Sequence, residues 1–283
     1  MENLRKRIEQ IKKKRPAYGP ILDFYQKIRE KQEEVKASLN IDPVAMSKQW
    51  KDLLAKEGFP LLQKEDFPID VESSLTLFPS ICEISKESNP FLPQEVKKIE
   101  ETFGSRKLDL KELFKRGIRE QRIEQVAEEF GLDKKVFLFL LQESARPSME
   151  AVVAKLHGEI PPGAQDKGSC PLCGSLPSLG LLKEETGKRF LFCPHCSYQW
   201  QVDRIACPFC SNTGHETLHY LYAEGEEAYR INLCEKCHQY IKTIDLRKMD
   251  VLDPFLEDIA TLHLDVLATQ KGFKRPSPNP WTS

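Results

Sequence analysis

Apolar residues recur at intervals of three and four positions through the first 157 residues, which is the periodicity of helices that bury one face. Ile21, Leu22, Tyr25 and Ile28 show this pattern first, and the charged residues that follow them are typical of a solvated face. Helices this short are stable only when they pack on one another. The pattern therefore predicts an all-helical domain over residues 1–157, a bundle of about six to eight helices.

Prolines and glycines divide this helical pattern. Asp42-Pro43 predicts the start of a helix and Gly58 its end. Residues 58–79 contain prolines and show little periodicity, so we expect an extended connection there. Residues 158–169 hold two prolines and three glycines with few side chains to bury, and they predict a linker between the helical domain and the rest of the chain.

Beyond residue 170 the pattern becomes the alternation of short β-strands. Aromatic and branched side chains alternate in residues 189–192 and 198–202, and we expect Trp200 to pack inside. Asp253-Pro254 then predicts a last amphipathic helix, which ends before Gly272. Its candidate core residues are Leu256, Ile259, Leu262 and Leu267.

Eight of the nine cysteines lie in four Cys-x-x-Cys pairs within a 68-residue window. Two cysteines three positions apart turn their sulfurs toward one ion, and two such knuckles complete a tetrahedral tetrathiolate site. Four knuckles therefore predict two metal ions. The ninth cysteine, Cys82, lies among apolar residues and is expected to be a small packed side chain. The candidate metal ligands are Cys170, Cys173, Cys193, Cys196, Cys207, Cys210, Cys234 and Cys237.

The intervals between the pairs favour a consecutive arrangement, in which the first pair joins the second and the third joins the fourth. The 19 and 23 residues inside these intervals each suit a β-hairpin, whereas the 10 residues between Cys196 and Cys207 suit a connection. A crossed arrangement stays open. The knuckle that begins Cys170-Pro recurs as Cys207-Pro, which indicates an internal repeat. Modules this small need a metal ion in place of an apolar core.

These observations predict an α+β multidomain protein. Its all-helical N-terminal domain precedes two small rubredoxin-like or zinc-ribbon modules, at residues 170–204 and 205–245, and a C-terminal helix and tail at residues 246–283. Sulfur tetrahedra suit both iron and zinc. Four histidines near the knuckles could replace a sulfur, but eight cysteines already fill two sites. Because such sites are closed to water and substrate, metal-assisted hydrolysis is not expected. These histidines are His195, His215, His219 and His238.

Charge and hydropathy exclude several classes of function. The net charge is −1 at pH 7, and residues 168–242 carry seven basic against eight acidic groups, which argues against nucleic acid as a partner. The longest apolar run, Val136–Leu141, is too short to span a membrane. The charged N-terminus is not a signal peptide, so we expect a cytoplasmic protein whose reduced thiols bind metal rather than form disulfides. No nucleophile–base constellation, phosphate loop or distinctive carboxylate pair indicates catalysis.

The ordered motifs resemble those of the FdhE family of formate dehydrogenase accessory proteins. The resemblance covers nearly the whole chain, and it is most specific in the four knuckles together with Trp200 and Arg204. The helical half, including Gly58-Phe59-Pro60, is similar in layout to that of the family but carries weaker motifs. The sequence departs from the fullest family pattern at Ser197 and Ser211, which follow their knuckles, and at Glu235-Lys236, which fills the last knuckle without a proline.

This resemblance implies a non-catalytic, cytoplasmic maturation factor that acts on the molybdenum- or tungsten-containing catalytic subunit of formate dehydrogenase. It implies rubredoxin-like knuckles that hold two metal ions, with iron favoured and zinc as the alternative. A homodimer is compatible with this role. Two other functions stay open: an electron carrier with iron in each module, and a nucleic-acid-binding zinc-ribbon protein, which the charge balance disfavours.

Overall fold

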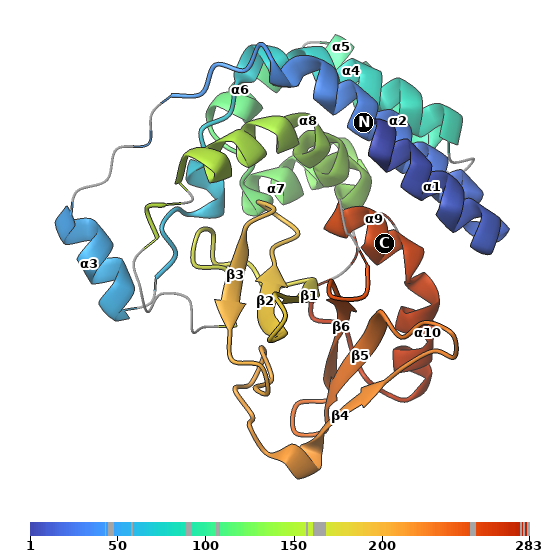
Figure 1. Cartoon of the computed structure of the whole chain (residues 1–283). Helices are drawn as coiled ribbons and strands as arrows, with labels where there is room; N and C mark the ends of the chain where they lie inside the picture. The colour runs from blue at the N-terminus through green and yellow to red at the C-terminus, as the bar shows by residue number, and fades with distance from the viewer. Residues whose placement is uncertain are drawn as a thin grey trace. The chain divides into compact units, whose positions relative to one another are not determined.

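In the computed structural model the chain forms two compact units (Figure 1). The helical unit comprises Met1–Ala45 and Leu62–Leu156, and the sheet unit comprises Met46–Leu61 and His157–Thr282. The structure describes residues 1–42, 44, 48–57, 59–88, 92–105, 108–156, 158–160, 168–249, 253–277, 279 and 281. Pro43 and Gly58 of the predicted helix boundaries, and residues 161–167 of the predicted linker, lie outside this set.

The helical unit confirms the all-helical first region. Its core forms where α2, α4 and α8 pack together, with Tyr25, Ile81 and Phe137 fully buried. Cys82 is also fully buried, as expected for a packed side chain, and burial raises the pKa of its thiol to about 12. The elements are α1 (Glu2–Lys14), η1 (Pro16–Tyr18), α2 (Gly19–Lys36), η2 (Lys64–Asp66), α4 (Val71–Ser88), α5 (Pro93–Gly104), α6 (Leu110–Lys115), α7 (Glu120–Phe130) and α8 (Lys134–Leu156).

The extended connection expected over residues 58–79 is wrong in its second half, because α4 begins at Val71 and contains Pro79. A proline inside a helix removes one backbone hydrogen bond and crowds the preceding turn. Leu77, Phe78 and Ile81 are nevertheless buried against neighbouring helices. Tertiary packing of this stripe therefore outweighs the local preference that the sequence shows.

A buried polar cluster links α2 to α8. Gln32 donates to the carbonyl of Glu143 at 2.8 Å and to its carboxylate at 3.0 Å. The same carboxylate accepts hydrogen bonds from Nε and Nη2 of Arg146 at 2.8 and 2.7 Å. Arg146 and Glu143 are only 3% and 1% exposed. The buried cation of this unit thus has a buried carboxylate partner, as burial of charge requires.

The sheet unit is built on one six-stranded sheet with the strand order β3-β2-β1-β6-β5-β4. Neighbouring strands are antiparallel except β1 and β6, which are parallel and pair Leu179 with Lys242. The two cysteine-rich segments therefore share a continuous sheet, which the cysteine spacing did not predict. The strands are β1 (Leu179–Lys183), β2 (Lys188–Phe192), β3 (Gln199–Val202), β4 (Leu218–Leu221), β5 (Tyr229–Cys234) and β6 (Gln239–Asp245), with η3 (His215–Thr217) before β4.

The internal repeat is visible in this topology. In each half a knuckle precedes two antiparallel strands, and a second knuckle precedes a third strand. The third strand of the second half, β6, pairs in parallel with the first strand of the first half, β1. The halves therefore follow one another head to tail along the sheet. Trp200 on β3 is 1% exposed and packs inside as expected, and Tyr240 on β6 is 3% exposed.

The C-terminal helix is divided into α9 (Pro254–Ala260) and α10 (Leu262–Gln270). Asp253 caps α9 by accepting a hydrogen bond from the Phe255 amide at 3.0 Å, as the sequence predicts. Leu256 and Ile259 are fully buried, whereas Leu264 and Ala268 take the core positions expected for Leu262 and Leu267. The backbone of Thr261 is not helical (φ −120°, ψ 27°), so the periodicity of α9 does not continue into α10.

A buried lysine donates hydrogen bonds at the break between the two helices. Lys242 of β6 is 2% exposed, and its Nζ donates to the carbonyls of Asp258 at 2.9 Å and Thr261 at 3.3 Å. These carbonyls lie where the helical hydrogen bonds of α9 end. The strand thus supplies a side-chain donor for the end of the helix.

Residues 46–61, which the sequence places with the helical domain, group with the sheet unit. They include α3 (Lys48–Glu57). The Leu61 amide donates to the carbonyl of Pro171 in the first knuckle at 2.9 Å, and Lys51 pairs with Glu159. Among the described residues, no helix combines the length and apolar character that a bilayer span requires.

Candidate metal centres

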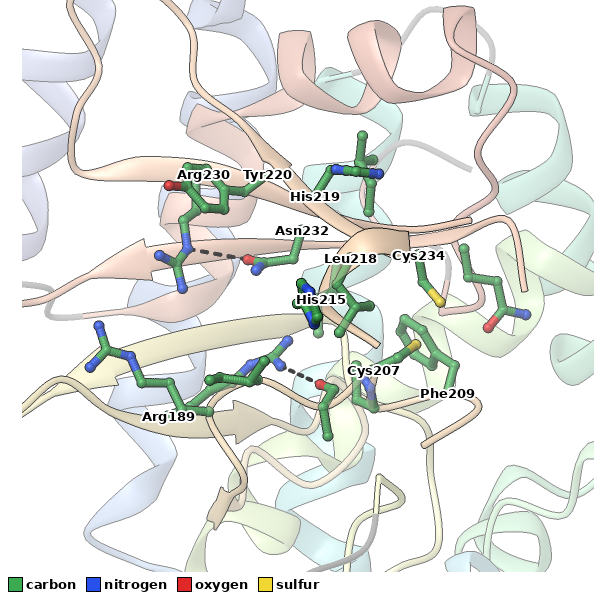
Figure 2. A pocket seen from close by; sticks show the side chains of 17 residues that line it. Arg189, Cys207, Phe209, His215, Leu218, His219, Tyr220, Arg230, Asn232 and Cys234 are labelled. Atoms are coloured by element: carbon green, nitrogen blue, oxygen red, sulfur yellow. Dashed lines mark hydrogen bonds between the residues drawn. The ribbon is translucent and has the colours of Figure 1, made fainter. Parts of the chain in front are cut away.

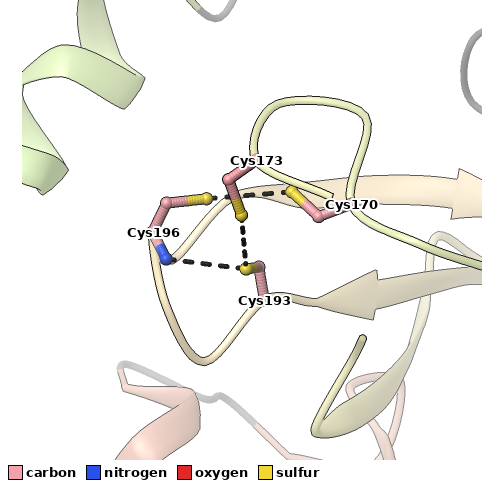
Figure 3. A group of neighbouring side chains, drawn as sticks. All are labelled: Cys170, Cys173, Cys193 and Cys196. Atoms are coloured by element: carbon pink, nitrogen blue, oxygen red, sulfur yellow. Dashed lines mark hydrogen bonds between the residues drawn. The ribbon is translucent and has the colours of Figure 1, made fainter. Parts of the chain in front are cut away.

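The first cysteine cluster brings together the knuckles that flank β1 and β2 (Figure 3). The Sγ atoms of Cys170 and Cys196 lie 3.7 Å apart, and those of Cys173 and Cys193 lie 3.4 Å apart. All four sulfurs lie within 4.8 Å of one another, and all four residues are buried. A tetrahedral ion with metal–sulfur bonds of about 2.3 Å places its sulfurs about 3.8 Å apart. The free thiols therefore fit one shared ion.

The second cluster repeats this geometry with more exposure. Sγ of Cys207 lies 3.8 Å from that of Cys237, and Sγ of Cys210 lies 3.7 Å from that of Cys234. Cys210 and Cys237 are half-buried, whereas their counterparts in the first cluster are buried. The grouping in both clusters is the consecutive one that the intervals favour, so the crossed arrangement is wrong. Two four-cysteine clusters could thus hold two metal ions.

The backbone of the knuckles explains why the sulfurs converge. The residue after the second cysteine has a positive φ in all four: Gly174 (73°), Ser197 (65°), Ser211 (56°) and His238 (53°). In the first three knuckles its amide donates to the carbonyl of the first cysteine at 2.8 to 3.0 Å. This left-handed turn closes the loop and aims both sulfurs at one point.

Serine is strained in this turn, so Ser211→Gly should stabilise the sheet unit. A left-handed residue with a Cβ costs roughly 1–2 kcal/mol, and glycine loses about 0.5–1 kcal/mol of extra chain entropy on folding. The net gain is about 0.5–1 kcal/mol, which raises the midpoint of thermal unfolding by a few degrees. Ser211→Ala keeps the Cβ and serves as the control. A lower midpoint for Ser211→Gly would contradict the argument.

Hydrogen bonds and burial divide the thiols into two kinds. Burial raises the pKa of Cys170 and Cys196, while hydrogen bonds from the neighbouring thiols, Cys170 first, lower that of Cys173. At Cys234 burial opposes ionisation, but the Cys237 amide and the Asn212 side chain lower the pKa to about 7. Metal binding therefore requires the release of protons from the remaining thiols.

Donors to sulfur come from the knuckle backbone and from one side chain that the sequence did not single out. The Cys196 amide approaches Sγ of Cys193 at 3.5 Å, as expected for a knuckle. Asn212 Nδ2 approaches Sγ of Cys234 at 3.6 Å and also donates to Thr217 at 2.7 Å. Such contacts stabilise thiolate charge. An asparagine two positions after a knuckle was the available signal for this role.

The histidines take no part in the two clusters among the described residues, where each cluster consists of four cysteines. His215 and His219 line a neighbouring cavity, and the ring of His238 lies 6.1 Å from that of Phe273. Among the described residues, each cluster offers four soft sulfur donors and no nitrogen or oxygen ligand. This donor set fits zinc or iron better than magnesium or calcium.

Known proteins show the same arrangement of sequence and fold. The family model "FdhE, central domain" matches residues 169–204, and "FdhE, C-terminal domain" matches residues 205–282. A protein FdhE homolog of Aquifex aeolicus is 28% identical over 276 residues, which cover 96% of this chain and 92% of that relative. Protein FdhE of Escherichia coli K12 is 34% identical over 115 residues, which cover 40% of this chain and only 37% of the relative.

A solved structure extends the likeness to the whole fold. The crystal structure of the FdhE protein from Pseudomonas aeruginosa superposes with a TM-score of 0.66 at 20% sequence identity, and covers 98% of this chain and 93% of that one. The two family models meet at residues 204 and 205, the connection between the cysteine clusters. Residues 169–282 therefore carry the central and C-terminal domains of the FdhE family, and the chain as a whole is similar to FdhE proteins in sequence and in fold.

Proposed function

We propose that the chain is a non-catalytic accessory factor for formate dehydrogenase, and that its eight paired cysteines hold two structural metal ions. The sulfur geometry carries the metal assignment, because both clusters have the separations of a closed tetrahedral site. The similarity to FdhE proteins supports the accessory role. The ligands we propose are Cys170, Cys173, Cys193, Cys196, Cys207, Cys210, Cys234 and Cys237.

The partner we propose is the molybdenum- or tungsten-containing catalytic subunit of formate dehydrogenase, bound during maturation in the cytoplasm. The metals would stabilise the shape of the sheet unit rather than bind substrate, since four sulfurs leave no open position. We favour iron as the metal, on the resemblance to the family, with zinc as the alternative. This role requires neither nucleic acid nor a membrane span, and it is compatible with a homodimer.

One preparation tests these proposals. The protein is purified without added metal, and its iron and zinc contents are measured together with its visible spectrum. We expect two metal atoms per chain, with the charge-transfer colour of iron–thiolate bonds if iron is bound. Cys82→Ser, which changes the cysteine outside the clusters, should keep both atoms. A metal-free, fully folded protein would contradict the ligand assignment.

The partner is tested separately by co-purification with the formate dehydrogenase catalytic subunit from cells that express both. We expect a complex that survives moderate salt. Absence of that complex, together with tight and salt-sensitive binding to nucleic acid, would instead support the nucleic-acid-binding alternative.

The exposure of the second cluster favours one other function, that of an electron carrier. Cys210 and Cys237 are half-buried, so electrons could reach an iron ion held there from the protein surface. This function predicts a reversible one-electron redox couple. Electron transfer should be slower at the first cluster, because its four cysteines are buried. A zinc-filled protein would be colourless and redox-silent.

A further inference from the structure

A cavity of about 310 Å³ lies in the sheet unit beside the second cysteine cluster (Figure 2). Its walls come from β2, β4, β5 and β6, from η3, and from the segment 204–209 that leads into the third knuckle. A volume of this size matches the lower range of sites for small molecules. Cys207 and Cys234 of the second cluster form part of its lining, but most of the lining residues are not cysteines, so the cavity extends beyond the space that one ion would fill.

The cavity lies on one definite face of the sheet. Tyr240 and Lys242 of β6 both reach Asp265 of α10, at 2.9 and 2.6 Å. Successive strand residues point to opposite faces, so Ile241 between them faces away from α10. Asn232 of β5 pairs in register with Ile241 and lines the cavity with it. The cavity therefore occupies the face opposite α10.

Arg189 on β2 is the unusual residue of this face. It is 3% exposed, and its Nη1 donates to the carbonyl of Ala206 at 2.7 Å. Its Nε and Nη2 are buried, and none of the described residues accepts a hydrogen bond from them, neither a carboxylate nor a cysteine sulfur. Arg146, which is equally buried, uses these same two nitrogens to hold Glu143. Arg189 lines the cavity and thus holds a buried two-pronged edge without an acceptor among the described residues, a donor pair that suits an oxyanion once a small side-chain movement turns it toward the cavity.

The surroundings of Arg189 add positive charge. Arg204 and Arg230 also line the cavity. Its described lining includes the Cys207 and Cys234 thiols of the second cluster but no carboxylate. Arg230 Nε donates to Asn232 at 3.3 Å, as the dashed line in Figure 2 shows. At the rim, Glu235 is already paired with His219 at 3.1 Å. Burial, together with the Arg230 charge, lowers the pKa of Arg189 to about 10 while the Cys207 thiolate opposes this, so Arg189 stays charged near neutral pH.

We propose that this cavity binds the phosphate group of a small ligand, with Arg189 as the buried anchor. Three guanidinium groups around one space favour a doubly charged phosphate over a singly charged carboxylate, because each added cation interacts with the whole anion charge. The site is independent of the proposed accessory role. It requires only the fold of the sheet unit.

The rest of the cavity suits an apolar body attached to that phosphate. Phe209, Tyr220 and Ile205 line it, and Tyr220 and Ile205 are 58% and 67% exposed, so apolar surface lies open beside the arginines. A single inorganic phosphate would leave these side chains uncovered. A phosphate ester with a flat or apolar group would cover them, and should therefore bind more tightly than inorganic phosphate.

The test is calorimetric titration of the full-length protein, with its metal content measured in every sample. Inorganic phosphate, phenyl phosphate and benzoate are the three probes. We expect saturable binding of both phosphates, tighter for phenyl phosphate, and binding of benzoate at least tenfold weaker. Arg189→Gln should weaken phenyl phosphate binding tenfold or more, since it removes a charged hydrogen-bonding pair. Arg122→Gln, an exposed arginine of the helical unit, is the matched control and should change nothing.

Arg230→Gln is a second variant, which tests the same site if the Arg189→Gln protein does not fold. Arg230 is only half-buried, and the same tenfold weakening is expected from its substitution. The proposal is overturned if the wild-type protein binds neither phosphate at concentrations up to about 10 mM. It is also overturned if benzoate binds as tightly as phenyl phosphate, or if a folded Arg230→Gln protein binds phenyl phosphate as the wild type does.

Discussion

Cys193→Ser is expected to remove one of two metal atoms per chain and to unfold the first half of the sheet. Cys193 is fully buried, and its Sγ lies 3.4 Å from that of Cys173. A structural ion held by four thiolates contributes on the order of 10–16 kcal/mol of apparent binding free energy, which becomes folding free energy. Serine offers a poor ligand in place of a thiolate, so most of this contribution is lost.

The shared sheet predicts how far the damage spreads. β1 and β2 flank the damaged cluster, and β1 is the parallel partner of β6. When β1 detaches, β6 becomes an edge strand but keeps its antiparallel pairing with β5. Amide hydrogen exchange should therefore accelerate fully in β1, β2 and β3 and only along the β1-facing edge of β6. The second metal atom should stay bound.

Cys210→Ser is the reciprocal variant, and Cys82→Ala is the control. Cys210 belongs to the second cluster and is half-buried, so its substitution should release the second metal atom and leave the first. Cys82 lies in the helical unit, outside both clusters, and its substitution should leave two atoms per chain. Unchanged metal content in Cys193→Ser would show that our ligand assignment is wrong.

The cysteine clusters could be predicted from sequence because their geometry is local. A Cys-x-x-Cys knuckle fixes two sulfurs within four residues, and the hairpin-sized intervals bring knuckles together without distant information. The same holds for Asp253, whose cap depends on residues within one helical turn. Such features are set by short-range chemistry, which a sequence displays directly.

The joined sheet and the helix around Pro79 were missed because both depend on distant contacts. Leu179 and Lys242 pair across the two halves, and neither strand carries a mark that identifies the other as a partner. Pro79 signals a break, but burial of its neighbours on other helices keeps α4 intact. Packing energy of this kind is invisible to local propensity.

The charge count of the cysteine region was also incomplete as a guide to its surface. Seven basic and eight acidic groups nearly cancel in residues 168–242. Folding nevertheless gathers Arg189, Arg204 and Arg230 around one cavity and leaves carboxylates out of its described lining. A charged residue placed on the same strand as Phe190 and Phe192 was the available signal, since buried strands rarely carry an arginine without a partner.

A network of four charges, of which Lys242 and Asp258 are buried and Asp265 and Arg275 half-buried, joins the C-terminal segment to the sheet. Lys242 forms ion pairs with Asp258 at 2.7 Å and Asp265 at 2.6 Å. Arg275, beyond α10, pairs with the same two carboxylates at 2.7 and 3.2 Å. Burial disfavours ionisation of Asp258, but the charges of Lys242 and Arg275 outweigh it and lower its pKa. The network therefore depends on both cations.

The lowered pKa of Asp258 fixes the direction of the pH dependence. An unfolded aspartate has a pKa of about 3.9, and the pKa of the folded Asp258 lies below that value. The stabilisation is therefore fully present above about pH 4, and it is lost as the pH falls through the folded pKa. Removal of Lys242 raises the folded pKa, so the sheet unit of such a variant should begin to unfold at a higher pH than the wild type.

Lys242→Met is accordingly expected to destabilise the sheet unit by about 3–5 kcal/mol, because it leaves the carboxylates of Asp258 and Asp265 with one cation. It also removes the hydrogen bonds that Lys242 donates to the carbonyls of Asp258 and Thr261. Tryptophan fluorescence during urea unfolding measures this, since Trp50, Trp200 and Trp281 all belong to the sheet unit. Lys248→Met removes an exposed lysine from the same unit and should change stability by less than about 0.5 kcal/mol. Equal stabilities for the two variants, or an acid transition that does not move in Lys242→Met, would show that the packing of α9 and α10 rather than these charges holds the C-terminal segment on the sheet.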